Sequence, residues 1–124
     1  MARANCAFEV RNAGSGQSTQ LGHPMHYVLI YDYTPDYLER RAEFRDEHLK
    51  LAWASHERGE LQLAGVLGEP IDGGLLWFKA DSPAIIEAFV ANDPYLKAGL
   101  ISKWRIRPWL TAVGAQANAP VYPG

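Results

Sequence analysis

The chain has 124 residues, of which 48% are hydrophobic and 21% charged, the proportions of a globular protein with one modest core. The formal net charge of −2 and the pI near 6.0 argue against a nucleic-acid-binding protein, which would usually be basic. The single cysteine, Cys6, excludes a disulfide within these residues, and no apolar run approaches the ~20 residues that span a bilayer. We therefore expect a cytoplasmic protein that binds neither nucleic acid nor a membrane.

Three segments of the chain differ in composition. Residues 1–24 are rich in Asn, Ser, Gly and Gln, which is typical of loops, and predict a flexible N-terminal extension. Residues 25–113 carry the hydrophobic periodicity of a folded domain. Residues 114–124 contain Ala, Asn and Pro without a pattern and predict a loose C-terminal tail.

The folded region opens with a strand and a long helix. Residues 26–33 are rich in β-branched and aromatic side chains on both faces, which predicts a central strand covered on both sides. A single amphipathic helix is predicted over residues 34–59. Thr34 is its expected N-cap, Pro35 its first helical residue and Gly59 its stop.

This helix carries an unusual group of positive side chains. Arg41, Arg45 and His48 follow one another at i, i+4 and i+7, so on an uninterrupted helix they form one row beside the apolar stripe. Two guanidinium groups and an imidazole at the edge of a core are costly unless something anionic meets them. We therefore expect a small anionic molecule or a buried acid next to this row.

The second half of the domain repeats the alternation of strands and a helix. Strands are predicted at residues 61–66 and 75–80, with the hairpin turn at residues 72–74, Asp-Gly-Gly. The next helix begins with Ser82 as cap and Pro83 at its first position.

The end of that helix leads into the last strand. The helix stops before Asp93, because a residue that precedes a proline is disfavoured in helical geometry. Residues 95–99 then form a connecting turn, and residues 101–113 form a strand with alternating basic and apolar side chains.

The resulting order β-α-β-β-α-β predicts an α+β, ferredoxin-like fold: a four-stranded antiparallel sheet with two helices on one face. The other face also carries large apolar side chains that need cover. A second copy of the same sheet is the economical cover, so we predict a homodimer through the sheet face.

Several short motifs occur in a characteristic order. They are LERRAEFRDEHL in the first helix, AG before the hairpin turn, DSP at the second helix, DPYLKAGL after it, and RPW at the end of the last strand. Together they resemble the YciI (YCII-related) family over about residues 25–113. The resemblance implies small cytoplasmic proteins with a ferredoxin-like domain that pair sheet to sheet as a dimeric α/β barrel. One member of the family removes chloride from a chlorinated hydroxyquinol.

The resemblance also implies an active site. A His–Asp pair is regarded as the active site of the family, and its motif positions here are His48 and Asp93, with Arg41 and Arg45 as companions.

These residues suit proton transfer. The imidazole of His48 titrates near neutrality and can act as general acid or base, while Asp93 would fix its tautomer and raise its basicity. Arg41 and Arg45 would hold a carboxylate or phenolate and stabilise developing negative charge.

Two further residues complete the predicted substrate-binding set. Asp32 is the one charge in the first strand that looks buried, and Tyr95 belongs to a group of aromatic residues that would wall a ring-sized pocket. That group consists of Tyr27, Tyr31, Trp53, Trp77 and Tyr95. The combined hypothesis is a cofactor-independent lyase or isomerase that acts on a small anionic, aromatic-derived ring compound by proton abstraction, elimination or dehydrochlorination.

Other interpretations stay open from the sequence. His48 can be a core histidine bonded to a carboxylate, Asp93 an ordinary helix terminator, and the arginines members of a solvated charged surface. The same fold can serve as a non-catalytic small-anion-binding or regulatory module, or as a purely structural dimer. The sequence shows no metal-ligand spacing and no glycine-rich phosphate loop, so no metal or cofactor is predicted.

Overall fold

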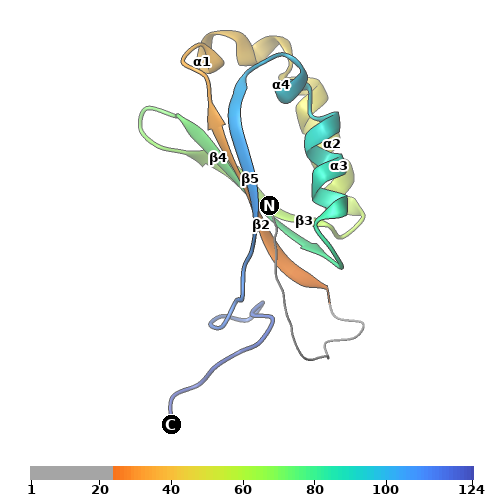
Figure 1. Ribbon diagram of the computed structural model, residues 1–124, viewed down its shortest axis with the longest axis vertical. Coiled ribbons are helices and arrows are strands. Elements are labelled where there is room, and N and C mark those ends of the chain that lie inside the picture. The colour runs from red at the N-terminus through yellow and green to blue at the C-terminus, as the bar shows by residue number, and fades with distance from the viewer. Residues whose placement is uncertain (1–23) are drawn as a thin grey trace.

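The computed structural model describes residues 24–124 (Figure 1). The predicted extension over residues 1–24, which includes Cys6, therefore lies almost entirely outside the described residues. The helices and strands follow one another as β2 (Met25–Tyr33), α1 (Tyr37–Arg40), the 3-10 helix η1 (Arg41–Glu43), α2 (Arg45–Glu57), β3 (Leu61–Leu67), β4 (Gly73–Ala80), α3 (Ala84–Asn92), α4 (Pro94–Lys97) and β5 (Ile101–Pro108).

The four strands form one antiparallel sheet in the order β3-β4-β2-β5. The helices cover one face of this sheet (Figure 1). The predicted α+β ferredoxin-like fold is therefore confirmed, and β2 is one of its two central strands, as its apolar composition indicates. Among the helices of residues 24–124, none combines the length and the hydrophobicity needed to cross a membrane.

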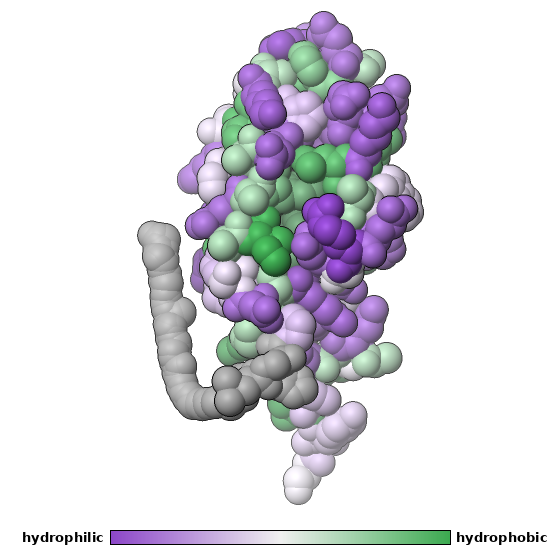
Figure 2. All heavy atoms as spheres, turned by 90° about the vertical axis from the view of Figure 1, so that its right-hand side faces the viewer, coloured by the Kyte–Doolittle hydropathy of each residue, from purple (hydrophilic) through white to green (hydrophobic). Residues whose placement is uncertain are grey.

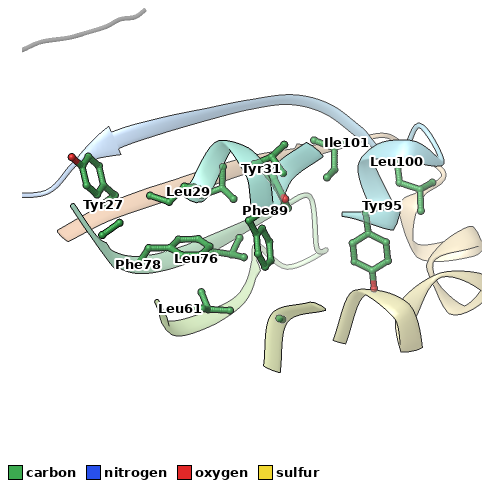
Figure 3. Packing of buried hydrophobic residues seen from close by; sticks show 14 of the residues in the cluster. Tyr27, Leu29, Tyr31, Leu61, Leu76, Phe78, Phe89, Tyr95, Leu100 and Ile101 are labelled. Atoms are coloured by element: carbon green, nitrogen blue, oxygen red, sulfur yellow. The ribbon is translucent and has the colours of Figure 1, made fainter. Parts of the chain in front are cut away.

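The core lies between the sheet and the helices. Every second residue of β2 faces it, because side chains in a strand alternate between the two faces. Phe78 of β4 and Phe89 of α3 meet edge to face, with ring centroids 5.2 Å apart (Figure 3). The other large buried side chains include Tyr27, Leu29, Tyr31, Leu76, Ile86, Val90, Tyr95 and Leu100.

The outer side of the helices is mainly polar. Figure 2 shows this side of the molecule, where hydrophilic side chains surround a smaller apolar area. The large apolar side chains that α2 and α3 leave exposed are Leu49, Trp53 and Ile85. The helices are thus amphipathic in the way that a one-sided cover of a sheet requires.

The second face of the sheet carries apolar side chains that the described chain covers only in part, since Trp109 packs edge to face on Trp77. The register places Val28 opposite Trp77 and Ile30 opposite Leu75, and Trp77 also lies opposite Leu63, which is 69% exposed. A hollow of about 540 Å³ lies over this face, lined by β3, Leu75, Trp77 and the end of β5.

The predicted single helix over residues 34–59 is wrong. The chain forms α1, η1 and α2 instead, and the break falls at Phe44, whose backbone angles (φ −116°, ψ −1°) stay in the right-handed region but far from ideal α-helical values, and whose side chain packs against the core. Thr34 is not the N-cap, since its hydroxyl bonds the carboxylate of Asp36 (2.6 Å) and the helix begins at Tyr37. The stop at Gly59 is confirmed by its positive φ of 85°.

Three other boundaries also differ from the prediction. The hairpin turn lies before Gly73 and Gly74, because both glycines belong to β4 and pair with residues of β2. Residues 95–99 are not a simple turn, because α4 runs from Pro94 to Lys97. The last strand ends at Pro108 rather than at residue 113, since a proline has no N–H to donate to the sheet.

The residues after β5, which we call the C-terminal arm (residues 109–124), fold back on themselves below the sheet (Figure 1). Thr111 Oγ1 accepts the N–H of Asn118 at 2.7 Å and lies within hydrogen-bond distance of Nδ1 of the buried His26, also at 2.7 Å. A neutral His26 with an unprotonated Nδ1 can accept the hydroxyl proton of Thr111. Burial, together with the charge of Lys79, lowers the pKa of His26 below its ordinary value.

This arrangement predicts a pH-dependent stability. A lowered pKa in the folded state means that the neutral imidazole contributes stability above the ordinary value of 6.5 and that this contribution is lost as the pH falls through the folded-state pKa. We expect urea unfolding of His26→Gln to depend less on pH between about 7 and 5 than that of the wild type. The control Thr111→Ser keeps the hydroxyl and should keep the wild-type slope; equal slopes for His26→Gln and the wild type would contradict this account.

A second prediction concerns the close approach of β2 and β4. A Cβ atom at Gly73 would lie 2.7 Å from the backbone oxygen of Tyr31, whereas one at Gly65 of β3 would have no neighbour within 4 Å. Gly73→Ala should therefore destabilise the fold by about 1–3 kcal/mol, because backbone atoms must move apart. Gly65→Ala is the matched control and should cost little; thermal unfolding measures both, and equal melting temperatures would refute the steric argument.

Candidate active site

The structure brings His48 and Asp93 together. His48 lies in the first turn of α2, and Asp93 lies between α3 and α4, 45 residues further along the chain. Nδ1 of the imidazole is 3.0 Å from Oδ1 of the carboxylate. We call these two side chains the His–Asp pair.

The carboxylate of Asp93 is fully buried and has several donors. Oδ1 accepts the backbone N–H of Tyr95 at 3.0 Å in addition to His48, and Oδ2 accepts the hydroxyl of Tyr31 at 2.8 Å. The bond to Tyr95 also makes Asp93 the N-cap of α4. Because all of these contacts use oxygen as acceptor, they fit a carboxylate that carries its negative charge.

The contacts of His48 fix the roles of its two ring nitrogens. Nδ1 must hold a proton to donate to Asp93, which leaves Nε2 as the nitrogen that can give or take a proton. The imidazole stacks on the ring of Tyr95, with centroids 4.2 Å apart and planes at 16°. Its side chain is 15% exposed, so the ring is held from one side and stays within reach of solvent.

Four tyrosines, which we call the tyrosine cluster, surround the His–Asp pair: Tyr31, Tyr33, Tyr37 and Tyr95. The rings of Tyr33 and Tyr37 stack at 3.7 Å. Burial raises the pKa of Tyr31 well above its ordinary range, and the nearby charge of Asp93 raises it further. Burial likewise raises the pKa of Tyr33 and of Tyr95, so these phenols remain hydrogen-bond donors at neutral pH.

The two arginines lie beside this cluster. The guanidinium carbon of Arg41 is 5.7 Å from the ring centroid of Tyr37, a cation–π contact. Burial raises the pKa of Tyr95, and the positive charge of the exposed Arg45 opposes that effect. Within residues 24–124, neither arginine has an acidic ion-pair partner. The single row expected from the sequence is lost, because η1 separates Arg41 from α2.

Asp32 does not join this site. Its neighbour Tyr31 faces the helices, and the alternation of β2 turns Asp32 to the other face, where it is exposed and lies opposite Lys103. The sequence marked Asp32 because a charge in an apolar strand is unusual, but it did not reveal which residue of the strand would meet Asp93. That residue is Tyr31, which the sequence suggested only as a pocket wall.

Two hollows of about 540 and 520 Å³ lie away from the His–Asp pair. They border the second sheet face and the C-terminal arm, and neither His48 nor Asp93 lines them. In the part of the chain that the structure describes, no three His, Cys, Asp or Glu residues gather in a way that could hold a metal ion. The groups that the structure places at the pair are an imidazole, a carboxylate and the phenols of the tyrosine cluster.

The fold is that of a small α+β protein, and in residues 24–124 it brings an imidazole against a buried carboxylate. The family model of the YCII-related domain matches residues 25–110, and the chain belongs to this family. No curated protein matches the sequence.

One solved structure similar to this chain is 5-chloro-2-hydroxyhydroquinone dehydrochlorinase (TftG) from Burkholderia phenoliruptrix AC1100, in complex with 2,5-dihydroxybenzoquinone. The match has a TM-score of 0.61 and 23% identity and covers 71% of this chain and 96% of that one. At this identity the likeness concerns the fold.

The burial of Asp93 predicts a large effect of its neutralisation. In Asp93→Asn an NH₂ group replaces one carboxylate oxygen and points its N–H groups at a hydrogen-bond donor of the network. The buried network also loses the negative charge that its donors stabilise. We expect a loss of about 2–4 kcal/mol in the free energy of unfolding, measured by urea denaturation. The control Asp36→Asn changes a carboxylate that is 45% exposed and should have a much smaller effect. Equal effects of the two substitutions would show that the buried network contributes little.

Proposed function

We propose that this protein is a cofactor-independent lyase or isomerase that transfers a proton on a small anionic, aromatic-derived ring compound. The observation that supports it best is the 3.0 Å contact between His48 Nδ1 and a fully buried Asp93, which leaves Nε2 of a partly exposed imidazole as the acid–base atom. A buried carboxylate behind an accessible imidazole is the arrangement that general base catalysis needs.

The proposed step begins with Nε2 of His48 taking a proton from a hydroxyl group of the substrate, or from a carbon next to a carbonyl. The electron pair of a broken C–H bond forms a C=C bond in the ring, and that of a broken O–H bond forms a C=O bond. In an isomerisation, the imidazolium returns the proton to a ring carbon at the other end of the displaced double bond. In an elimination, chloride departs with its bonding electrons from a saturated carbon next to the one that lost the proton, so a chlorinated aromatic ring must first isomerise to a form in which the carbon that bears chlorine is saturated. Asp93 stabilises the imidazolium during this step.

The charge around the pair suits an anionic ring. Arg41 and Arg45 have no acidic partner in residues 24–124, so their guanidinium groups are available to a phenolate or carboxylate. Burial raises the pKa of Tyr33 and of Tyr95, so the phenols beside the pair add no negative charge that would repel an anionic ring. The similar fold of TftG, which is named for a dehydrochlorination and binds a quinone, supports elimination as the reaction class.

The partly uncovered sheet face supports a further part of the proposal, a homodimer. Val28, Leu63, Leu75 and Trp77 form a continuous apolar surface on this face. A second copy of the sheet, packed face to face as a dimeric α/β barrel, would remove this surface from water and leave the His–Asp pair on the helix side.

The proposal predicts a selective loss of activity. Chloride release from 5-chloro-2-hydroxyhydroquinone, followed with an ion-selective electrode, should fall by about 10²–10⁴-fold in His48→Ala, because the acid–base atom is gone. The control His56→Ala removes the other histidine of α2, whose Nδ1 contacts the backbone oxygen of Leu61, and should keep the activity. Undiminished turnover in His48→Ala would refute the mechanism.

The same probe separates catalysis from binding alone. A thermal shift with aromatic and dicarboxylic acids, without turnover and without change between about pH 5 and 8, would instead identify a non-catalytic small-anion-binding module.

A further inference from the structure

The hydroxyl of Tyr31 makes an internal bond that its ring packing does not require. It donates to Oδ2 of Asp93 at 2.8 Å, across 62 residues of sequence, and both side chains are fully buried. A phenylalanine at position 31 would fill the same part of the core. A buried hydroxyl is favourable only with a partner, and Asp93 is that partner.

The bonds of Asp93 divide between its two oxygens. Oδ1 serves His48 and the N–H of Tyr95, which caps α4, so both of these bonds are explained without Tyr31. The bond to Tyr31 holds Oδ2 from the sheet side. With Oδ2 held there, the plane of the carboxylate is fixed and Oδ1 is kept toward Nδ1 of His48.

We infer that Tyr31 is a positioning residue of the His–Asp pair: its hydroxyl orients the carboxylate of Asp93 and takes up part of its charge, and it thereby sets the proton affinity of His48. The inference rests on the proposed acid–base function. It adds to that function a residue of the sheet that does not touch the imidazole.

Two observations support this role. Burial, and then the charge of Asp93, raises the pKa of Tyr31, so the hydroxyl stays protonated wherever the imidazole titrates. The pairing of β2 with β5 shifts register between Asp32 and Tyr33, so Tyr31 lies at the end of the regularly paired part of the strand, and such irregularities occur next to functional sites. The other titratable or charged groups near the pair are Tyr33 of β2, Tyr37 of α1, Arg41 of η1, Arg45 of α2 and Tyr95 of α4.

The test is an NMR titration of the His48 imidazole in the wild type and in Tyr31→Phe. Without the hydroxyl, the charge of Asp93 acts more fully on the imidazolium, so the pKa of His48 should rise by about 0.5–1 unit. The control Tyr33→Phe removes a phenol from the same strand and cluster that has no bond to Asp93, and it should shift the pKa of His48 far less. A folded Tyr31→Phe protein with an unchanged His48 pKa would overturn the inference.

Two further measurements identify the route of the effect. In an Asp93→Asn background, Tyr31→Phe should no longer shift the pKa of His48, since the two substitutions act through one contact; a full shift there would overturn the inference. In the wild type, the buried and hydrogen-bonded hydroxyl proton of Tyr31 should change its chemical shift as His48 titrates. A resonance that does not respond would overturn the inference even if the variants fail to fold.

These readouts do not depend on turnover. If His48 shifts as expected but no substrate is turned over, Tyr31 still positions the pair and the proposed function fails. If turnover exists, the acidic limb of the pH profile of kcat/KM should move in Tyr31→Phe by the same amount as the His48 pKa, with KM nearly unchanged. An unmoved limb would count against the inference alone.

Discussion

The buried carboxylate of Asp93 is the constraint on which the rest of the structure depends. A charge removed from water is strongly unfavourable unless donors surround it, and the donors here come from three elements: Tyr31 of β2, His48 of α2 and the backbone of α4. The same bonds that make the charge tolerable also tie the sheet to two helices. The same hydrogen bonds therefore stabilise the fold and build the candidate site, and a substitution that removes one of them affects both.

The break in the first helical region follows from this constraint. A continuous helix would carry Arg41, Arg45 and His48 in one row along one axis. The 3-10 turn η1 and the distorted backbone of Phe44 separate α1 from α2, so that His48 meets Asp93 while Arg41 lies against Tyr37. Phe44 packs against the core at the break. This tertiary contact favours the break in a sequence whose local signals favour a continuous helix.

The sequence was sufficient for the fold because the fold depends on local signals: the β-branched and aromatic composition of residues 26–33, the stop at Gly59, and the proline after Asp93. It missed the helix break and the end of β5, which depend on packing and on pairing between strands. His48 and Asp93 came from a motif and from charge spacing. Tyr31 could not be preferred over Asp32, because which face of β2 meets the acid is decided by register with β4 and β5.

The register of β2 determines which side chains each face of the sheet carries. On β2 the odd-numbered residue Tyr31 faces Asp93, while the even-numbered Val28 and Ile30 face the apolar surface that we assign to a second copy. A slip of one residue would exchange these sets, removing the donor from a buried charge and turning Asp32 into the core. The acid thus selects the register of the central strand, and the register in turn decides which side chains the second face presents. The apolar surface and the His–Asp pair are two consequences of the same alternation.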